Sequence, residues 1–157
     1  MTLQGSAVCL GADIDTDVII AGRYLRTKDR RVWAEHVFED LDPALAARLK
    51  GAVIIAGTNF GCGSSREQAP VALKEAGVVG VIASSFARIF FRNAINVGLP
   101  VMECGEVRCR DGAPVSFSLE GGWVEVDGVR NDATPLSPRM LEIIRYGGLV
   151  EYWRAQQ

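Results

Sequence analysis

The chain has little that would direct it to nucleic acid or to a membrane. Its 17 basic and 19 acidic side chains give a net charge of −2, so it has no general attraction to phosphate backbones or anionic lipid. No uncharged apolar run reaches the length of a membrane span. The N-terminus lacks a basic leader, and Asp13 interrupts its mildly apolar start. We therefore expect no signal peptide and a cytoplasmic protein.

Side chains that bind metals or assist nucleophiles are also scarce. The one histidine, His36, is interpreted as a surface or packing residue. The four cysteines are Cys9, Cys62, Cys104 and Cys109. Cys104 and Cys109 have no second pair and no histidine nearby, so we expect no zinc site. In the absence of a secretory leader, we expect the cysteines to be reduced thiols.

The most informative stretch is the glycine-rich loop 57–67, GTNFGCGSSRE. The apolar run 52–56 before it is typical of a buried strand, and the stretch 68–76 after it has helical periodicity. Ser65 followed by Gln68 fits a capping box at the start of that helix. A helix start attracts anions, and the guanidinium of Arg66 suits a carboxylate or a phosphate. The loop therefore predicts a catalytic or anion-binding site, and the alternative is a tight turn with a good helix cap.

Familiar loop motifs do not fit this stretch. A Walker loop needs a lysine before its serine, and none is present. A dinucleotide-binding loop needs a third glycine where Arg66 stands. A nucleophile elbow needs glycines two residues either side of Ser64, where the chain has Cys62 and Arg66. A cysteine protease would have to pair Cys62 with His36, which we consider remote.

Two polar segments upstream carry candidate side chains. In 13–17, three acids alternate, but the glycine and the closing glutamate of a calcium loop are missing. This segment is either a solvated turn or the source of an acid that orients an arginine. Segment 23–27 combines two arginines, a tyrosine and a threonine, a set that can bind an anion.

The remaining pattern indicates an α/β fold with parallel strands, flanking helices and a C-terminal antiparallel section. A second buried strand spans 78–83, and Ser84 and Ser85 are expected to cap a helix that runs to Asn96. Phe86, Ile89 and Phe90 are expected on its buried stripe. Further elements are expected as a strand at 99–102, antiparallel strands at 115–119 and 123–126, helices at 44–49 and from 137, and an apolar anchor at 149–153.

Several of these stretches together resemble one family. The loop GCGSSRE at 61–67 resembles the active-site loop of the aconitase superfamily. The segments 13–17, 24–27, 85–90, 92–93 and 147–150 match as well, in order and over almost the whole chain. The chain is therefore similar to the detached small subunits of 3-isopropylmalate isomerase and homoaconitase. One departure is Pro70, which should loosen the first helical turn or displace the helix start.

The resemblance implies a single swivelling β/β/α domain over residues 1–157 and a hydro-lyase of amino-acid biosynthesis, including leucine biosynthesis. It implies that Ser64 is the base, that Arg66 binds a carboxylate, that Asp17 orients the site and that Ser65 helps to bind substrate. It also implies a large partner subunit with a [4Fe–4S] cluster. For this reason no cysteine of this chain is assigned to the cluster, and no metal or cofactor is expected in the chain itself.

The same resemblance places the variable part of the substrate near Arg26 and Thr27. Arginine suits an anionic tail, as in homoaconitate, since burying its charge against an isopropyl group would be costly. We therefore favour homoaconitate-like or broad specificity over strict isopropylmalate specificity. Two other classes remain open: a regulatory module that binds a carboxylate or phosphate, and a self-sufficient hydrolase that uses Ser64 or Cys62.

Overall fold

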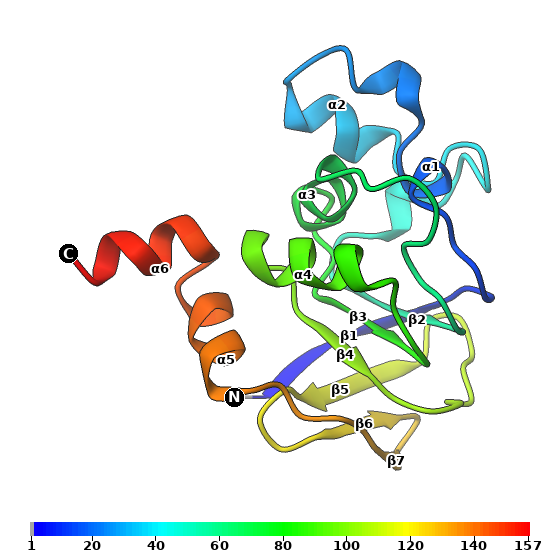
Figure 1. Cartoon of the computed structure of the whole chain (residues 1–157). Helices are drawn as coiled ribbons and strands as arrows, with labels where there is room; N and C mark the ends of the chain where they lie inside the picture. Colours follow the sequence, from blue (N-terminus) through cyan, green and yellow to red (C-terminus); the bar gives the residue numbers. More distant parts are fainter. Residues whose placement is uncertain (1) are drawn as a thin grey trace.

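The computed structural model describes residues 2–157, and its centre is one seven-stranded sheet (Figure 1). The strands lie in the order β4-β3-β2-β1-β5-β6-β7. Their bounds are β1 Thr2–Cys9, β2 Ala52–Ala56, β3 Gly80–Ala83, β4 Val101–Glu103, β5 Pro114–Ser118, β6 Trp123–Val126 and β7 Val129–Asp132.

The sheet changes character at β1. Residues Ser6–Cys9 of β1 pair in parallel with β2, and β3 and β4 continue the parallel half. Residues Thr2–Ser6 of the same strand pair antiparallel to β5, which leads to β6 and β7. The predicted combination of parallel strands with a C-terminal antiparallel section is confirmed. The first half of β1 and the whole of β7 were not predicted.

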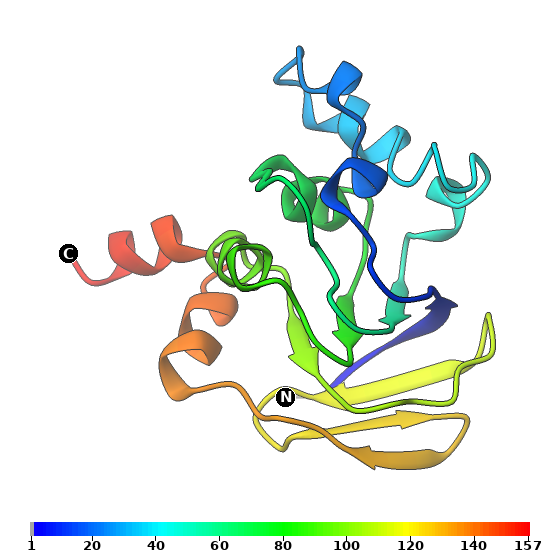
Figure 2. The ribbon, with the colours of Figure 1, turned by 45° about the vertical axis from the view of Figure 1, so that its right-hand side comes forward.

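Six α-helices and two 3₁₀ turns accompany the sheet in residues 2–157. Figures 1 and 2 both show α1 to α4 above the parallel half, with the ribbon β5–β7 on the opposite side of the molecule. The helices are α1 Thr16–Ile19, α2 Arg30–Glu35, α3 Gln68–Glu75, α4 Arg88–Val97, α5 Pro138–Arg145 and α6 Leu149–Ala155; the turns are η1 Gly22–Tyr24 and η2 Ala46–Arg48.

Apolar strands account for the core. All five residues of β2 are buried, as are all four of β3, because helices cover this part of the sheet. Phe117 of β5 is fully buried, and its ring fills the space beside Gly80 of β3, where a side chain would overlap it. The parallel pairing of Ser6–Cys9 with β2 places the carboxyl ends of β1 and β2 next to each other.

Three predicted helix features are wrong. Helix α4 begins at Arg88, and Ser85 does not cap it; its hydroxyl accepts a hydrogen bond from the backbone N–H of Asn59 at 2.9 Å. Ile89, expected on the buried stripe, is 52% exposed, and the buried residues of α4 are Phe90, Ala94 and Ile95. The helical stretch expected at 44–49 is only the 3₁₀ turn η2.

The C-terminal segment is less of an apolar anchor than its composition predicts. Tyr152 is buried, but Val150 and Trp153 are more than half exposed, because α6 packs mainly on α4 and α5. No helix within residues 2–157 is long and apolar enough to cross a membrane.

The expectation of four reduced cysteines is wrong for two of them. Cys9 and Cys109 form a disulfide, with Cα atoms 5.9 Å apart, while Cys62 and Cys104 are free. The bond joins the carboxyl end of β1 to the connection between β4 and β5. Sequence spacing did not reveal it because the two cysteines are 100 residues apart and meet only through the sheet.

Candidate active site

The candidate site lies where two loops leave the carboxyl ends of β1 and β2. Loop 10–17 and loop 57–62 run alongside each other and exchange backbone hydrogen bonds beyond the last residues of the sheet. These bonds run from Gly57 N to Gly11 O at 3.1 Å, Asp13 N to Thr58 O at 2.8 Å, Gly61 N to Ile14 O at 2.7 Å and Thr16 N to Cys62 O at 2.9 Å. The carboxyl ends of parallel strands are where α/β proteins commonly place their sites.

Two glycines let the loop pass close to its neighbours. Gly61 (φ +83°) lies against the ring of Phe90, and Gly63 (φ +84°) lies against the carboxylate of Asp15. A side chain at either position would overlap these groups, and positive φ is a conformation that glycine adopts without steric cost. The loop can therefore bring residues 64–66 next to the Asp15–Asp17 segment.

Helix α1 contributes a cap and a buried hydroxyl to the site. Asp15 caps α1 by accepting a hydrogen bond from Asp17 N at 2.7 Å. Thr16 is 1% exposed, and its hydroxyl donates to the backbone carbonyl of Ser64 at 2.5 Å. Sequence reasoning gave Thr16 no role, although a small hydroxyl between two acids in a matched segment was the available signal.

Asp17 and Arg66 form an ion pair, as expected if one acid orients the arginine. Arg66 Nε lies 2.5 Å from Asp17 Oδ1, although its N–H does not point along that line and the nitrogen is buried without a hydrogen-bond partner in residues 2–157. The pair is therefore a charge contact. The terminal nitrogens of Arg66 lie beside Gly22, where a Cβ would be 3.4 Å from Nη1. They keep donors for an anionic ligand.

The predicted capping box at Ser65 is wrong. Helix α3 begins at Gln68, after Glu67, and no side chain caps it. The cause is Pro70, whose missing N–H is tolerated only in the first turn, so the displaced helix start considered as one outcome of this proline is confirmed. Ser64 and Ser65 are exposed on the loop, and within the described chain neither hydroxyl makes a hydrogen bond. The helix N-terminus therefore does not act directly on Ser64, and Arg66 is the nearest cationic group along the loop.

Arg26 and Thr27 follow the 3₁₀ turn η1, whose first residue is the Gly22 that lies beside Arg66. Arg26 is exposed, and it forms no hydrogen bond or ion pair with any described residue. Thr27 is half-buried, and its hydroxyl oxygen accepts from Asp29 N at 3.1 Å. The structure therefore brings η1 next to Arg66, while the two predicted substrate-binding side chains make no direct contact with residues 64–66.

The free thiol of Cys62 is poorly suited to nucleophilic attack. Burial, and after it the charges of Asp15 and Asp13, raise the pKa of this thiol above its usual value, which keeps it protonated. Across residues 2–157 no group of three or more histidine, cysteine or acidic side chains is arranged to hold a metal ion.

Comparison with known proteins shows the family of this chain. A family model described as the aconitase C-terminal domain matches residues 12–105, which include both loops and α3. The chain belongs to this family. A 3-isopropylmalate dehydratase small subunit from Halothermothrix orenii is 49% identical over 156 residues, covering 96% of this chain and 94% of the relative.

Other relatives agree with this assignment. A methanogen homoaconitase small subunit from Methanothermobacter thermautotrophicus is 50% identical, with 96% of this chain and 90% of the relative covered. The crystal structure of a 3-isopropylmalate dehydratase from Methanocaldococcus jannaschii superposes with a TM-score of 0.94 at 42% identity, over 99% of this chain and 95% of that one. The suspected relationship and the mixed α/β fold are confirmed. A regulatory module and a self-sufficient hydrolase are not favoured.

Proposed function

We propose that this chain is the small subunit of a heteromeric hydro-lyase of the 3-isopropylmalate dehydratase or homoaconitase type, acting in the cytoplasm. The enzyme isomerises a 2- or 3-hydroxy di- or tricarboxylate by removing water and adding it back across the neighbouring carbon. The observation that carries the proposal is the Asp17–Arg66 pair beside an exposed Ser64, in a loop of the matched family.

In this proposal each side chain has a defined task. The alkoxide form of Ser64 accepts the proton of the C–H bond next to a carboxylate and becomes the neutral hydroxyl, the electrons of that bond form the C=C bond, and the substrate hydroxyl leaves with the C–O electron pair as hydroxide. Arg66 binds a carboxylate through its terminal nitrogens, and the charge of Asp17 holds its guanidinium in place. Ser65 and Thr27 add hydrogen bonds to substrate. Thr16, through the carbonyl of Ser64, keeps the base in position.

Within residues 2–157 no group of histidine, cysteine or acidic side chains is arranged to hold a metal ion that could assist the leaving hydroxyl. We infer that the partner is a large subunit with a [4Fe–4S] cluster, which would supply a Lewis acid for that hydroxyl. The residues of this chain then bind the carboxylates, orient the substrate and hold the proton at Ser64.

The test is reconstitution. The purified chain is assayed against cis-unsaturated di- and tricarboxylates, alone and with an iron–sulfur large subunit. We expect hydration only in the mixture, because the chain alone has a base and carboxylate-binding groups but no Lewis acid. Activity of the rigorously metal-free chain alone would contradict the division of labour.

The substrate tail is the second part of the proposal. Arg26 is exposed and unpaired among residues 2–157, so its charge is available for an anionic tail. Arg26→Val should lower kcat/KM for a substrate with a distal carboxylate by roughly 10- to 150-fold, the value of about 1.5–3 kcal/mol for a charge-assisted bond. The same change should spare or improve isopropylmalate.

The ratio of the two kcat/KM values is the measurement, because damage to folding or assembly cancels in it. Arg26→Lys keeps the charge but loses the planar fork, so its ratio should lie between those of the other two proteins. A ratio for Arg26→Val within about twofold of the wild-type ratio would assign Arg26 to solvent or to the subunit interface.

A further inference from the structure

The backbone of segment 24–27, which carries Arg26, is hydrogen-bonded to a buried tryptophan. Trp33, on α2, is 8% exposed. Its indole N–H lies 3.0 Å from the backbone carbonyl of Tyr24 and 3.2 Å from that of Thr27, and it donates to both. A single donor therefore joins the two ends of segment 24–27. Arg26 lies between the two carbonyls, and its own side chain has no partner in the described chain.

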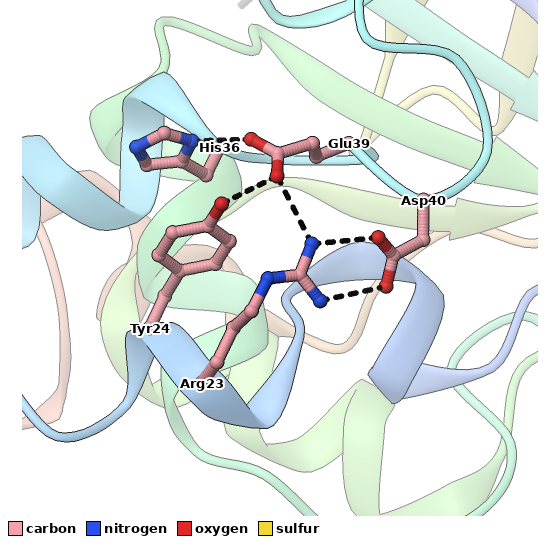
Figure 3. A network of polar contacts seen from close by, with 5 residues as sticks. All are labelled: Arg23, Tyr24, His36, Glu39 and Asp40. Carbon is pink, nitrogen blue, oxygen red and sulfur yellow. Dashed lines mark hydrogen bonds and ion pairs between the residues drawn. The ribbon is translucent and has the colours of Figure 1, made fainter.

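A polar network, drawn in Figure 3, contacts the same segment through the side chain of Tyr24. Glu39 accepts hydrogen bonds from the Tyr24 hydroxyl and from Arg23 Nη2, the latter at 3.0 Å, and its second oxygen contacts His36 Nδ1. The ring of His36 stacks on that of Tyr24 with centroids 4.0 Å apart and planes 5° apart. Arg23 binds Asp40 through both terminal nitrogens, at 2.7 and 3.2 Å.

These contacts account for His36, which the sequence indicated only as a surface or packing residue. They also bear on Arg26. An exposed arginine has high rotamer entropy, so its effect on a substrate depends on where the backbone places its Cα. The backbone carbonyls of Tyr24 and Thr27 accept hydrogen bonds from Trp33 on α2. Glu39, in the turn after α2, contacts the segment through the Tyr24 side chain. Both Trp33 and Glu39 lie outside loops 10–17 and 57–67.

We propose that Trp33 is a positioning residue for substrate specificity, with Glu39 as a second one, and that both act by fixing the backbone that presents Arg26. The inference rests on the proposed function, in which Arg26 binds the substrate tail. It adds that the preference for the tail depends on a buried donor that does not touch substrate.

The principal test uses Trp33→Phe in the reconstituted holoenzyme. This change removes the N–H donor and keeps an aromatic ring. We expect the ratio of kcat/KM for an anionic-tailed substrate to that for isopropylmalate to fall by roughly 2- to 10-fold, the range set by one net hydrogen bond. Trp153→Phe is the matched control, because Trp153 is 58% exposed on α6. It should leave the ratio unchanged. An equal loss with both substrates would assign Trp33 a purely structural role and overturn the proposal.

A double-variant cycle tests whether the effect passes through Arg26. In an Arg26→Val background, adding Trp33→Phe should no longer change the ratio, since there is no guanidinium left to position. A change of the same size in both backgrounds would overturn the proposal. If Arg26→Val shifts the ratio and Trp33→Phe does not, the positioning role fails while the proposed function stands.

Amide hydrogen exchange tests the positioning role without any enzyme activity, and therefore independently of the proposed function. In the isolated full chain, Trp33→Phe and Glu39→Gln should each accelerate amide hydrogen exchange at Leu25 and Asp29 more than in the parallel half of the sheet. Both amides donate hydrogen bonds within this region, from Leu25 N to Gly22 O and from Asp29 N to Thr27 Oγ1. Unchanged exchange at both amides would overturn the positioning role, whatever the activity of the holoenzyme.

Discussion

Ser64 combines a fixed backbone with a free hydroxyl. Its carbonyl is held by the buried Thr16, while its side chain is exposed and makes no hydrogen bond within residues 2–157. A serine oxygen is a weak base in water, so a role as base needs nearby positive charge when substrate binds. Arg66 supplies that charge within the loop, although its contact with Asp17 offsets part of it.

Ser64→Ala should therefore abolish turnover and leave binding intact. We expect kcat of the reconstituted enzyme to fall by about 10²–10⁴-fold or more, the scale of general acid–base catalysis, because the proton acceptor is removed. Substrate affinity should change little, since Arg66 remains. The measurement is single-turnover kinetics together with equilibrium binding. Ser65→Ala removes an exposed hydroxyl assigned to substrate binding, so its effect should appear in KM rather than in kcat. Near wild-type turnover of Ser64→Ala would move the base to Ser65.

The pKa of the Glu39 carboxyl is lowered by three neighbouring side chains. The Tyr24 hydroxyl, then His36, then Arg23 lower the pKa of this carboxyl from its ordinary 4.5 to about 2. A carboxylate with a depressed pKa favours the folded state above its ordinary pKa, and this contribution is lost as pH falls towards the depressed value. Its stabilisation is therefore complete above pH 4.5 and fades between pH 4.5 and about 2.

Glu39→Gln should therefore flatten the acid branch of the stability curve. Between pH 5 and pH 2.5 the free energy of unfolding of the variant should decrease less than that of the wild type, as measured by urea unfolding at each pH. Glu35→Gln, on α2 but outside the network, is the control for removing a carboxylate. Parallel acid branches for wild type and Glu39→Gln would mean that the network does not hold this carboxylate in solution.

Among single residues, the sequence predicted the contact between Asp17 and Arg66 better than the buried side chains that hold the backbone near the candidate site. Asp17 and Arg66 lie in contact, as the expectation that an acid orients an arginine required. Thr16 and Trp33 were not found, because their hydrogen bonds reach backbone carbonyls rather than charged partners. A backbone carbonyl is present in every residue, so sequence carries no signal for such a contact until the chain path is known.

Among the elements, buried strands were predictable and helix starts were not. Strand β2 matches the predicted run 52–56, since continuous burial selects an unbroken apolar sequence. The start of α3 depends on competing local signals: Ser65 with Gln68 favours an early cap, while Pro70 is tolerated only in the first turn, and the proline prevails. Before α4, the Ser85 hydroxyl accepts a hydrogen bond from the backbone N–H of Asn59. Because of this tertiary contact, Ser85 does not cap the helix.

For helix α6, apolar composition predicted more burial than the structure shows. Its composition predicted an anchor, yet Val150 and Trp153 are largely exposed and only Tyr152 is buried. Apolar composition predicts burial only if some surface is available to cover the helix, and the main contacts of α6 are with α4 and α5. Figures 1 and 2 both show it extending away from the sheet.

For the whole molecule, the disulfide closes a long loop of chain. The Cys9–Cys109 bond spans a sequence separation of 100, which includes β2 to β4 and loop 57–67. In the chain-entropy description, a cross-link of this span restricts the unfolded chain more than the folded one. Cys9 is followed directly by the loop that carries Asp15 and Asp17, so the bond lies at the base of the site without taking part in it.

Removing this bond should lower global stability and spare the chemistry. Cys109→Ser should lower the free energy of unfolding by about 2–5 kcal/mol, measured by urea unfolding at neutral pH without reductant. Cys62→Ser, which removes a free thiol, is the control and should change stability much less.

Thiol titration of the denatured, unreduced wild type should find the two free cysteines, Cys62 and Cys104. Four titrating thiols, or equal stability with and without a reducing dithiol, would show that the bond does not form in solution. Because β1 remains paired with β2 at Cys9 and Ile55, reconstituted activity of the folded Cys109→Ser variant should stay close to that of the wild type.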